Sequence, residues 1–232
     1  MNSMAQYGNI PGYPYCPPKN FEMTGKTWRF VIDGSGELLL NAINETNLTI
    51  IKPGEPPLTA PYLCMKADDT VYLLCTGTEE HTMIFALDAG KNLISCVALG
   101  KPGNKQSEAK IHFGAVVREG AELPAQRHSF TDDLWENRLR WTFGSELSFI
   151  YSYESGGKCR ISAQDGQSAI MDAEAVQIGQ GLYFLLVRGQ EPNGFFEQTS
   201  CFLMNFNRIT AVGLAFGPDM RPEPFGAIGS FE

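Results

Sequence analysis

Positive charge is scarce in this 232-residue chain, and no run of lysine and arginine occurs anywhere in it. The 18 Lys and Arg are outnumbered by 26 Asp and Glu, which gives a formal net charge of −8. A protein that binds a nucleic acid needs clustered basic side chains to contact the phosphates. We therefore expect no nucleic-acid partner.

Long apolar stretches and metal-binding patterns are missing as well. No apolar run approaches the ~20 residues of a membrane-spanning helix, and the N-terminus lacks the charged and apolar regions of a secretory signal. The six cysteines contain no Cys-x-x-Cys pair, and the three histidines are scattered without a second ligand at metal spacing. These absences predict a cytoplasmic protein with free thiols, no membrane partner, no metal and no cofactor.

Helical periodicity is the third absence, and strand patterns take its place. No segment shows an apolar period near 3.6 over more than two turns. Short runs rich in Val, Ile, Thr and aromatic residues alternate with turns that use the 24 Gly and 14 Pro. The pattern predicts an all-β fold of many short antiparallel strands.

The second half of the chain repeats the first in four blocks that come in the same order. The matching blocks begin at Gly25 and Asn137, Met65 and Val176, Thr82 and Ser200, and Phe113 and Phe225. Within the first two, Trp28 is matched to Trp141 and Val71 to Leu182. Four ordered matches indicate an internal duplication. The predicted organisation is a tail (1–23), an N-terminal module (24–118), a polar linker (119–130) and a C-terminal module (131–232).

Each module has the length and strand count of an up-and-down β-barrel. About eight strands leave room for one small ligand inside such a barrel. The prediction is therefore two tandem lipocalin-like barrels, and a single sheet shared by both repeats is the alternative.

Chemically useful side chains gather in the second module. Tyr151 and Tyr153 are two residues apart on one strand, so both point to the same face. Arg188 and Glu191 follow a later strand, and the four side chains converge if these strands are neighbours. The first module has Leu38–Ala42 at the place of the tyrosine pair, which predicts that the site lies in the second module.

Several of these segments resemble the MoaF family, named molybdenum cofactor biosynthesis protein F. The resemblance rests on residues 128–134 (HSFTDDL), Arg140 with Trp141, the strand 182–184 leading to Arg188 and Glu191, and the closing residues 225–227. It implies a calycin fold in which the two halves form separate modules.

The second module also resembles the phenolic acid decarboxylases, which are single-barrel lyases. Residues 149–156 (FIYSYESG) and 191–194 (EPNG) carry this similarity. It implies that Tyr151 and Tyr153 donate hydrogen bonds to a substrate carboxylate and that Glu191 acts as acid or base. Either Arg188 or Arg160 would then anchor an anion.

The same module supplies the other expected substrate-binding side chains, which are Arg160, Trp141, Tyr183 and Phe202. Packing of the sheet is the alternative role for Trp141 and for the tyrosine pair.

The resulting expectation is a MoaF-like, cofactor-independent lyase, isomerase or cyclase in a biosynthetic pathway. Its substrate would be a small aromatic or carbonyl-bearing metabolite. A non-catalytic carrier of lipocalin type and a structural partner of a larger enzyme are the alternatives. A homodimer is an open alternative for the assembly.

Overall fold

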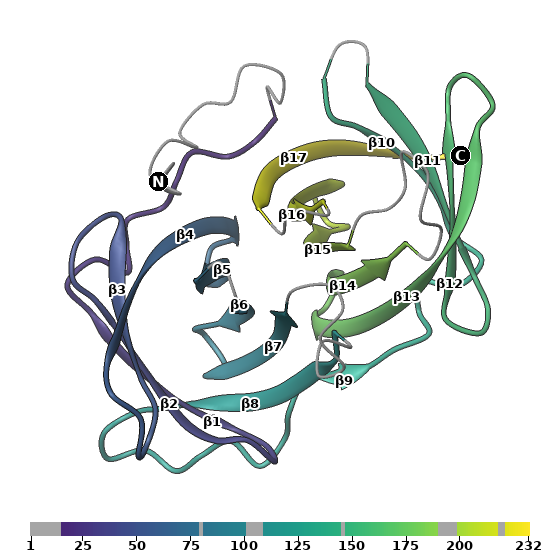
Figure 1. Ribbon diagram of the computed structural model, residues 1–232. Coiled ribbons are helices and arrows are strands. Elements are labelled where there is room, and N and C mark those ends of the chain that lie inside the picture. The colour runs from purple at the N-terminus through teal and green to yellow at the C-terminus, as the bar shows by residue number, and fades with distance from the viewer. Residues whose placement is uncertain (1–14, 79–80, 101–108, 145–146, 190–198, 218–220) are drawn as a thin grey trace. The chain divides into compact units, whose positions relative to one another are not determined.

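A computed structural model of the chain describes residues 15–78, 81–100, 109–144, 147–189, 199–217 and 221–232 (Figure 1). All regular elements in these ranges are β-strands. They belong to two compact units, one made of residues 18–128 and the other of residues 15–17 and 129–232. The all-β prediction is therefore confirmed.

The first unit is a closed barrel in which each strand is antiparallel to the next. The ring closes where β1 pairs with β8, with Phe30 opposite Val116. Its strands are β1 (Thr27–Ile32), β2 (Gly36–Ala42), β3 (Asn47–Ile51), β4 (Leu58–Asp68), β5 (Val71–Gly77), β6 (His81–Asp88), β7 (Leu93–Gly100) and β8 (Ile111–Val117).

The second unit forms its own ring of eight strands, closed by the β10–β17 and β12–β13 pairings. A short ninth strand, β9 (Ser129–Phe130), adds to the side of β13. The ring strands are β10 (Arg138–Thr142), β11 (Ser148–Glu154), β12 (Lys158–Ala163), β13 (Ser168–Gly179), β14 (Leu182–Arg188), β15 (Thr199–Asn205), β16 (Thr210–Phe216) and β17 (Pro222–Phe231). Two separate rings confirm the duplicated barrel and exclude the single shared sheet.

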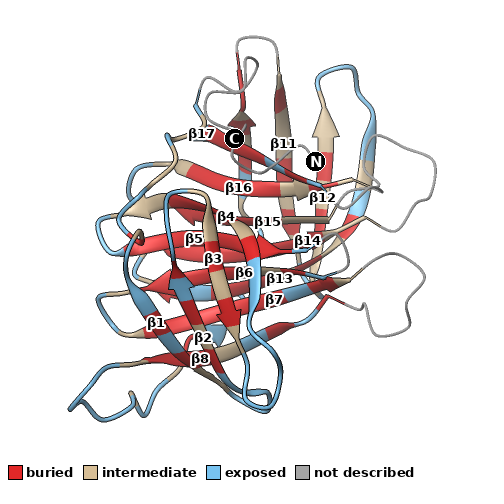
Figure 2. Ribbon diagram, turned by 60° about the vertical axis from the view of Figure 1, so that its left-hand side comes forward, coloured by how far each residue is buried: buried red, intermediate tan, exposed pale blue. Residues whose placement is uncertain are grey.

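Side chains alternate between the two faces of each strand, and the inward-facing apolar ones fill each barrel. In the first, the interior core includes Phe30, Leu40, Leu74 and Phe85, and the Phe30 and Phe85 ring centroids are 5.4 Å apart. Buried positions run along the strands of both units (Figure 2). Since burying one Phe or Leu side chain stabilises a fold by about 1.5–3 kcal/mol, these interiors supply most of the driving force for folding.

The two barrels repeat each other in backbone detail. In the first, the Gly25 amide donates to the Ala42 carbonyl at 2.8 Å; in the second, the Glu136 amide donates to the Tyr153 carbonyl at 2.8 Å. Gly25 and Glu136 both have a positive φ, 73° and 70°. Each turn leads into the first strand of its ring, so residues 111 positions apart are equivalent here.

This equivalence corrects one match made on sequence. Trp28 corresponds to Leu139, and Trp141 corresponds to Phe30, so the predicted match of Trp28 to Trp141 is wrong by two residues. A shift of two residues along a strand keeps a side chain on the same face, so both tryptophans still point inward. Tyr151 and Tyr153 correspond to Leu40 and Ala42.

The closing strands show a second shift, of one residue. Val71 and Leu182 are 111 positions apart, and the strand pairings lead from Val71 through Asp88 to Leu93. The same pairings lead from Leu182 through Asn205 to Thr210, so Leu93 and Thr210 are equivalent. Leu93 pairs with Ala115 in the first barrel, and Thr210 pairs with Ile228 in the second. Phe225 therefore corresponds to His112 rather than to Phe113. Because one residue reverses the side-chain direction, Phe225 packs inside its barrel whereas Phe113 is only half-buried.

Candidate functional site

The predicted tyrosine pair lies inside the second barrel. Tyr151 and Tyr153 both belong to its interior core, 8% and 1% exposed, with ring centroids 6.4 Å apart. Phe202 meets the Tyr151 ring edge-on at a centroid distance of 6.0 Å. Both side chains therefore point into the barrel, as their two-residue spacing on a strand predicts.

The Tyr153 hydroxyl is held by two neighbours. The Trp141 indole N–H donates to it at 3.4 Å, and it donates to the Met204 sulfur at 3.2 Å. Burial raises the pKa of Tyr153 well above its ordinary value, with a smaller contribution from Cys159. Tyr153 is thus a neutral, packed side chain, and Trp141 supports it.

The Tyr151 hydroxyl differs from that of Tyr153. Nothing in the described part of the chain accepts or donates a hydrogen bond to it. Burial is the main cause of its raised pKa, so this phenol keeps its proton at neutral pH. Tyr151 is therefore a neutral phenol of the barrel interior whose hydroxyl is unused by the described residues.

The two arginines proposed as anion anchors do not join the tyrosines. Arg160 lies between the inward-facing Cys159 and Ile161 on β12, so its side chain points outward, where it donates to Glu154 at 2.8 Å. Arg188 follows the inward-facing Val187 and pairs with Glu174. The predicted convergence of guanidinium and phenols is thus not present, because strand alternation places them on opposite faces.

The remaining predicted residues divide into two groups. Tyr183 lies in the same interior core, with its ring centroid 5.2 Å from that of Phe206. Burial raises the pKa of Tyr183, and the Asp133 carboxylate adds to the shift. Glu191, with the following residues 192–194, lies outside the described residues.

A cavity of about 280 Å³ lies in the first barrel, where no site was predicted. Its inner wall is apolar and includes Ile32, Leu38 and Phe85. Polar side chains from the β1–β2 turn, the β3–β4 loop and the start of β8 surround it. The lining residues with polar or ionisable side chains are Ser35, Glu37, Lys52, Glu55, Cys96 and His112.

Charge around this cavity is balanced by ion pairs. Arg29 holds the Glu37 carboxylate at 2.7 Å, and Lys52 lies 3.7 Å from Glu55. Both pairs are substantially exposed, so each contributes little to stability. The cavity therefore offers an apolar interior with a mouth of little net charge.

The opposite end of this barrel is closed by side chains. Arg118, just after β8, places its guanidinium 4.8 Å from the centre of the Trp28 ring, and Met23 is buried beside the core. Nearby, Glu22 accepts hydrogen bonds from Tyr72 at 2.5 Å and Lys66 at 2.9 Å. The Tyr72 hydrogen bond, followed by that of Lys66, lowers the pKa of Glu22 to about 2.

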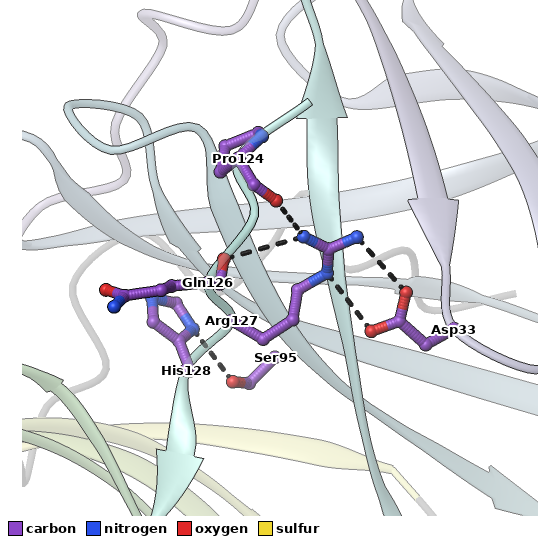
Figure 3. A network of polar contacts seen from close by, with 6 residues as sticks. All are labelled: Asp33, Ser95, Pro124, Gln126, Arg127 and His128. Atoms are coloured by element: carbon purple, nitrogen blue, oxygen red, sulfur yellow. Dashed lines mark hydrogen bonds and ion pairs between the residues drawn. The ribbon is translucent and has the colours of Figure 1, made fainter. Parts of the chain in front are cut away.

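A second polar cluster lies on the outside of the first barrel (Figure 3). Arg127 donates to both carboxylate oxygens of Asp33, at 3.1 and 3.3 Å, and to the carbonyl of Pro124. Next to it, His128 contacts the Ser95 hydroxyl. The cluster fastens the segment after β8 to the barrel and lines no described cavity, so we assign it a structural role.

Metal-ligand clusters and membrane-spanning helices are both absent from the described residues. Within them, three or more His, Cys, Asp and Glu side chains nowhere come together in a way that would hold a metal ion. Across the same ranges, no helix has the length and apolarity needed to cross a membrane. The six cysteines all lie in these ranges, and none of them forms a disulfide.

Comparison with known proteins adds no family assignment. No family model matches the chain. No curated protein matches it significantly. The resemblance to MoaF proteins and to phenolic acid decarboxylases therefore remains a prediction.

Proposed function

We propose that this protein binds a small, mostly apolar molecule inside the first barrel and acts as a carrier of lipocalin type. The cavity of about 280 Å³ between the β1–β2 turn and strands β6–β8 is the observation that carries the proposal. A cavity of about 150 Å³ is enough to hold benzene, so this one accepts a substituted ring or a short branched chain.

The lining residues set the orientation of the ligand. Ile32, Leu38 and Phe85 favour an apolar end inside the barrel. His112 and Ser35 supply hydrogen-bonding groups at the mouth, where a hydroxyl or carbonyl of the ligand would lie. Because the charged side chains around the mouth are paired, a neutral organic molecule suits the site better than an organic ion.

The test is a screen of small neutral aromatic and alicyclic compounds by saturation-transfer NMR, with affinities from calorimetry. Ala98 lines the mouth and is exposed, so Ala98→Trp fills the entrance without disturbing the core. We expect this change to weaken binding of hits by more than about tenfold, which is ~1.4 kcal/mol. Thr27→Trp, on the exposed outer side of β1, is the matched control.

Equal affinity of the hits for wild-type protein and Ala98→Trp would place binding elsewhere. The absence of any hit would contradict the carrier proposal.

A catalytic role in the second barrel is the second candidate, favoured by the Tyr151 hydroxyl. A phenol with an unused hydroxyl inside a barrel suits a substrate carbonyl or carboxylate, as in the predicted MoaF-like lyase or isomerase. Tyr151→Phe removes only this hydroxyl. Turnover of para-hydroxycinnamate-type acids that is lost in Tyr151→Phe and kept in Ala98→Trp would support this role. Turnover that survives Tyr151→Phe would eliminate it.

A further inference from the structure

Three side chains with soft or borderline metal-binding atoms line the cavity of the first barrel together. They are Met83 on β6, Cys96 on β7 and His112 on β8, three consecutive strands of the ring. Met83 and Cys96 have no role in the polar contacts described above, and the only role given to His112 is that of a hydrogen-bonding group at the cavity mouth. Because all three line one cavity, their side chains could bind the same metal ion.

Strand register brings Cys96 and His112 next to each other. Cys96 lies directly opposite His112 in the β7–β8 pairing, and both line the cavity. Directly opposite residues on one face of an antiparallel pair have Cβ atoms about 4.5–5.5 Å apart. The thiol and the imidazole can therefore reach one shared ion by rotamer changes alone.

Met83 completes the set from the other side of Cys96. Phe85 is directly opposite Cys96, and Met83 precedes Phe85 by two residues on the same face. Diagonal neighbours of this kind are about 7–8 Å apart, within reach of a long and flexible side chain. The methionine sulfur can thus approach the Cys96 thiol across the cavity wall.

The chemistry of these atoms selects a class of metal ion. Thiolate and thioether ligands favour Cu(I), and imidazole suits copper as well. Oxygen ligands for Mg²⁺ or Ca²⁺ are poorly placed, because Glu37 points outward next to the inward-facing Leu38 and pairs with Arg29, while Glu55 is paired with Lys52. We propose that Met83, Cys96 and His112 form a three-coordinate site for a soft monovalent ion such as Cu(I).

Binding is an exchange of a proton for the metal, without a change in oxidation state. Burial raises the pKa of the Cys96 thiol to about 12, so the thiol is protonated before the metal arrives. The S–H bond breaks, a sulfur–copper bond forms and the proton goes to solvent. The thiolate and Cu(I) together are neutral, which suits an apolar barrel interior.

The experiment titrates Cu(I) into the full chain without oxygen, in competition with the chromophoric chelator bicinchoninate. We expect one high-affinity equivalent and the near-ultraviolet charge-transfer band of a copper thiolate. Cys96→Ser, Met83→Leu and His112→Gln should each weaken binding, Cys96→Ser by more than about a hundredfold, or ~2.7 kcal/mol. The matched controls are Cys16→Ser, the least buried cysteine, and Met65→Leu.

A measurement on the wild-type protein removes the dependence on variants that fold poorly. Ag(I), a d¹⁰ substitute for Cu(I) that oxygen does not oxidise, should shift the methyl resonance of Met83 and the ring resonances of His112. Retention of binding in Cys96→Ser, shifts confined to other methionines, or no equivalent bound would each overturn the proposal. The carrier proposal is tested by organic ligands alone, so the two hypotheses can fail separately.

Discussion

The His128 imidazole contacts the Ser95 hydroxyl through Nδ1 at 2.9 Å, while its Nε2 atom is buried without a hydrogen-bond partner in the described structure. His128 is 5% exposed, whereas His81 and His112 are exposed. Burial lowers the pKa of His128 from 6.5 to about 4. The folded protein therefore takes up this proton less readily than the unfolded chain does.

This difference predicts a loss of stability in mild acid. Since the folded pKa is the lower one, the contribution is fully present above pH 6.5 and is lost as the pH falls toward 4. The loss amounts to at most about 3 kcal/mol. In denaturant titrations between pH 7.5 and 4, His128→Gln should remove this part of the pH dependence. His81→Gln is the control, and an unchanged profile in His128→Gln would contradict the prediction.

Arg118 is expected to stabilise the closed end of the first barrel. Its guanidinium lies over the Trp28 ring and also donates to Asn92 at 2.9 Å. Arg118→Ala should lower the free energy of unfolding by about 1–2 kcal/mol, through loss of the cation–π contact and of side-chain packing. Arg29→Ala, which breaks an exposed ion pair with Glu37, should cost less than about 1 kcal/mol. Similar losses in both variants would argue against the cation–π contact.

The two tyrosine hydroxyls of β11 should differ in their effect on stability. Tyr153→Phe removes the partner of the Trp141 indole N–H and should cost about 1–2 kcal/mol. Tyr151→Phe removes a hydroxyl that the described residues leave unused, so stability should change by less than about 0.5 kcal/mol. Thermal and urea unfolding of the two variants provide the comparison, each serving as the control for the other.

Gly213 of β16 is predicted to have no room for a side chain. A Cβ atom there would lie 2.2 Å from the Phe225 ring and 2.5 Å from the Cβ of Phe202. Gly213→Ala should therefore destabilise the protein by about 1–3 kcal/mol through overpacking. Adding Phe225→Leu should recover part of the loss, which a double-mutant cycle measures. Purely additive effects would show that the crowding is relieved in another way.

Much of the fold follows from local pattern. Strand alternation and turn residues predicted the all-β class, and the repeated blocks predicted two barrels. The two-residue spacing of Tyr151 and Tyr153 correctly placed both on one face. These features depend on the period of a strand, which the sequence expresses directly.

The errors arise where register or distant contacts decide the outcome. Matching Trp28 to Trp141 relied on identical residues, although the equivalent turns differ by two positions from that alignment. The sequence predicts Arg160 and Arg188 beside the tyrosines, but neighbouring residues on the same strands occupy the inward face. The alternation around Cys159 and Ile161 was a signal that could have placed Arg160 outside.

The cavity was missed for a different reason. Its walls come from the β1–β2 turn, the β3–β4 loop and β6–β8, segments far apart in the chain. Empty space depends on the combined volumes of these side chains. The pairing of Cys96 with His112 likewise depends on the β7–β8 register, which no short motif in the sequence fixes.

In a closed ring no strand is an edge, so the geometry of the ring does not depend on which strand comes first in the chain. Because β1 pairs with β8, and β10 pairs with β17, the chain enters and leaves each ring on adjacent strands. A copy of such a ring can be appended in tandem without opening the original. By the same logic, each ring should tolerate circular permutation, with its old ends joined by a short linker and new ends cut in a hairpin.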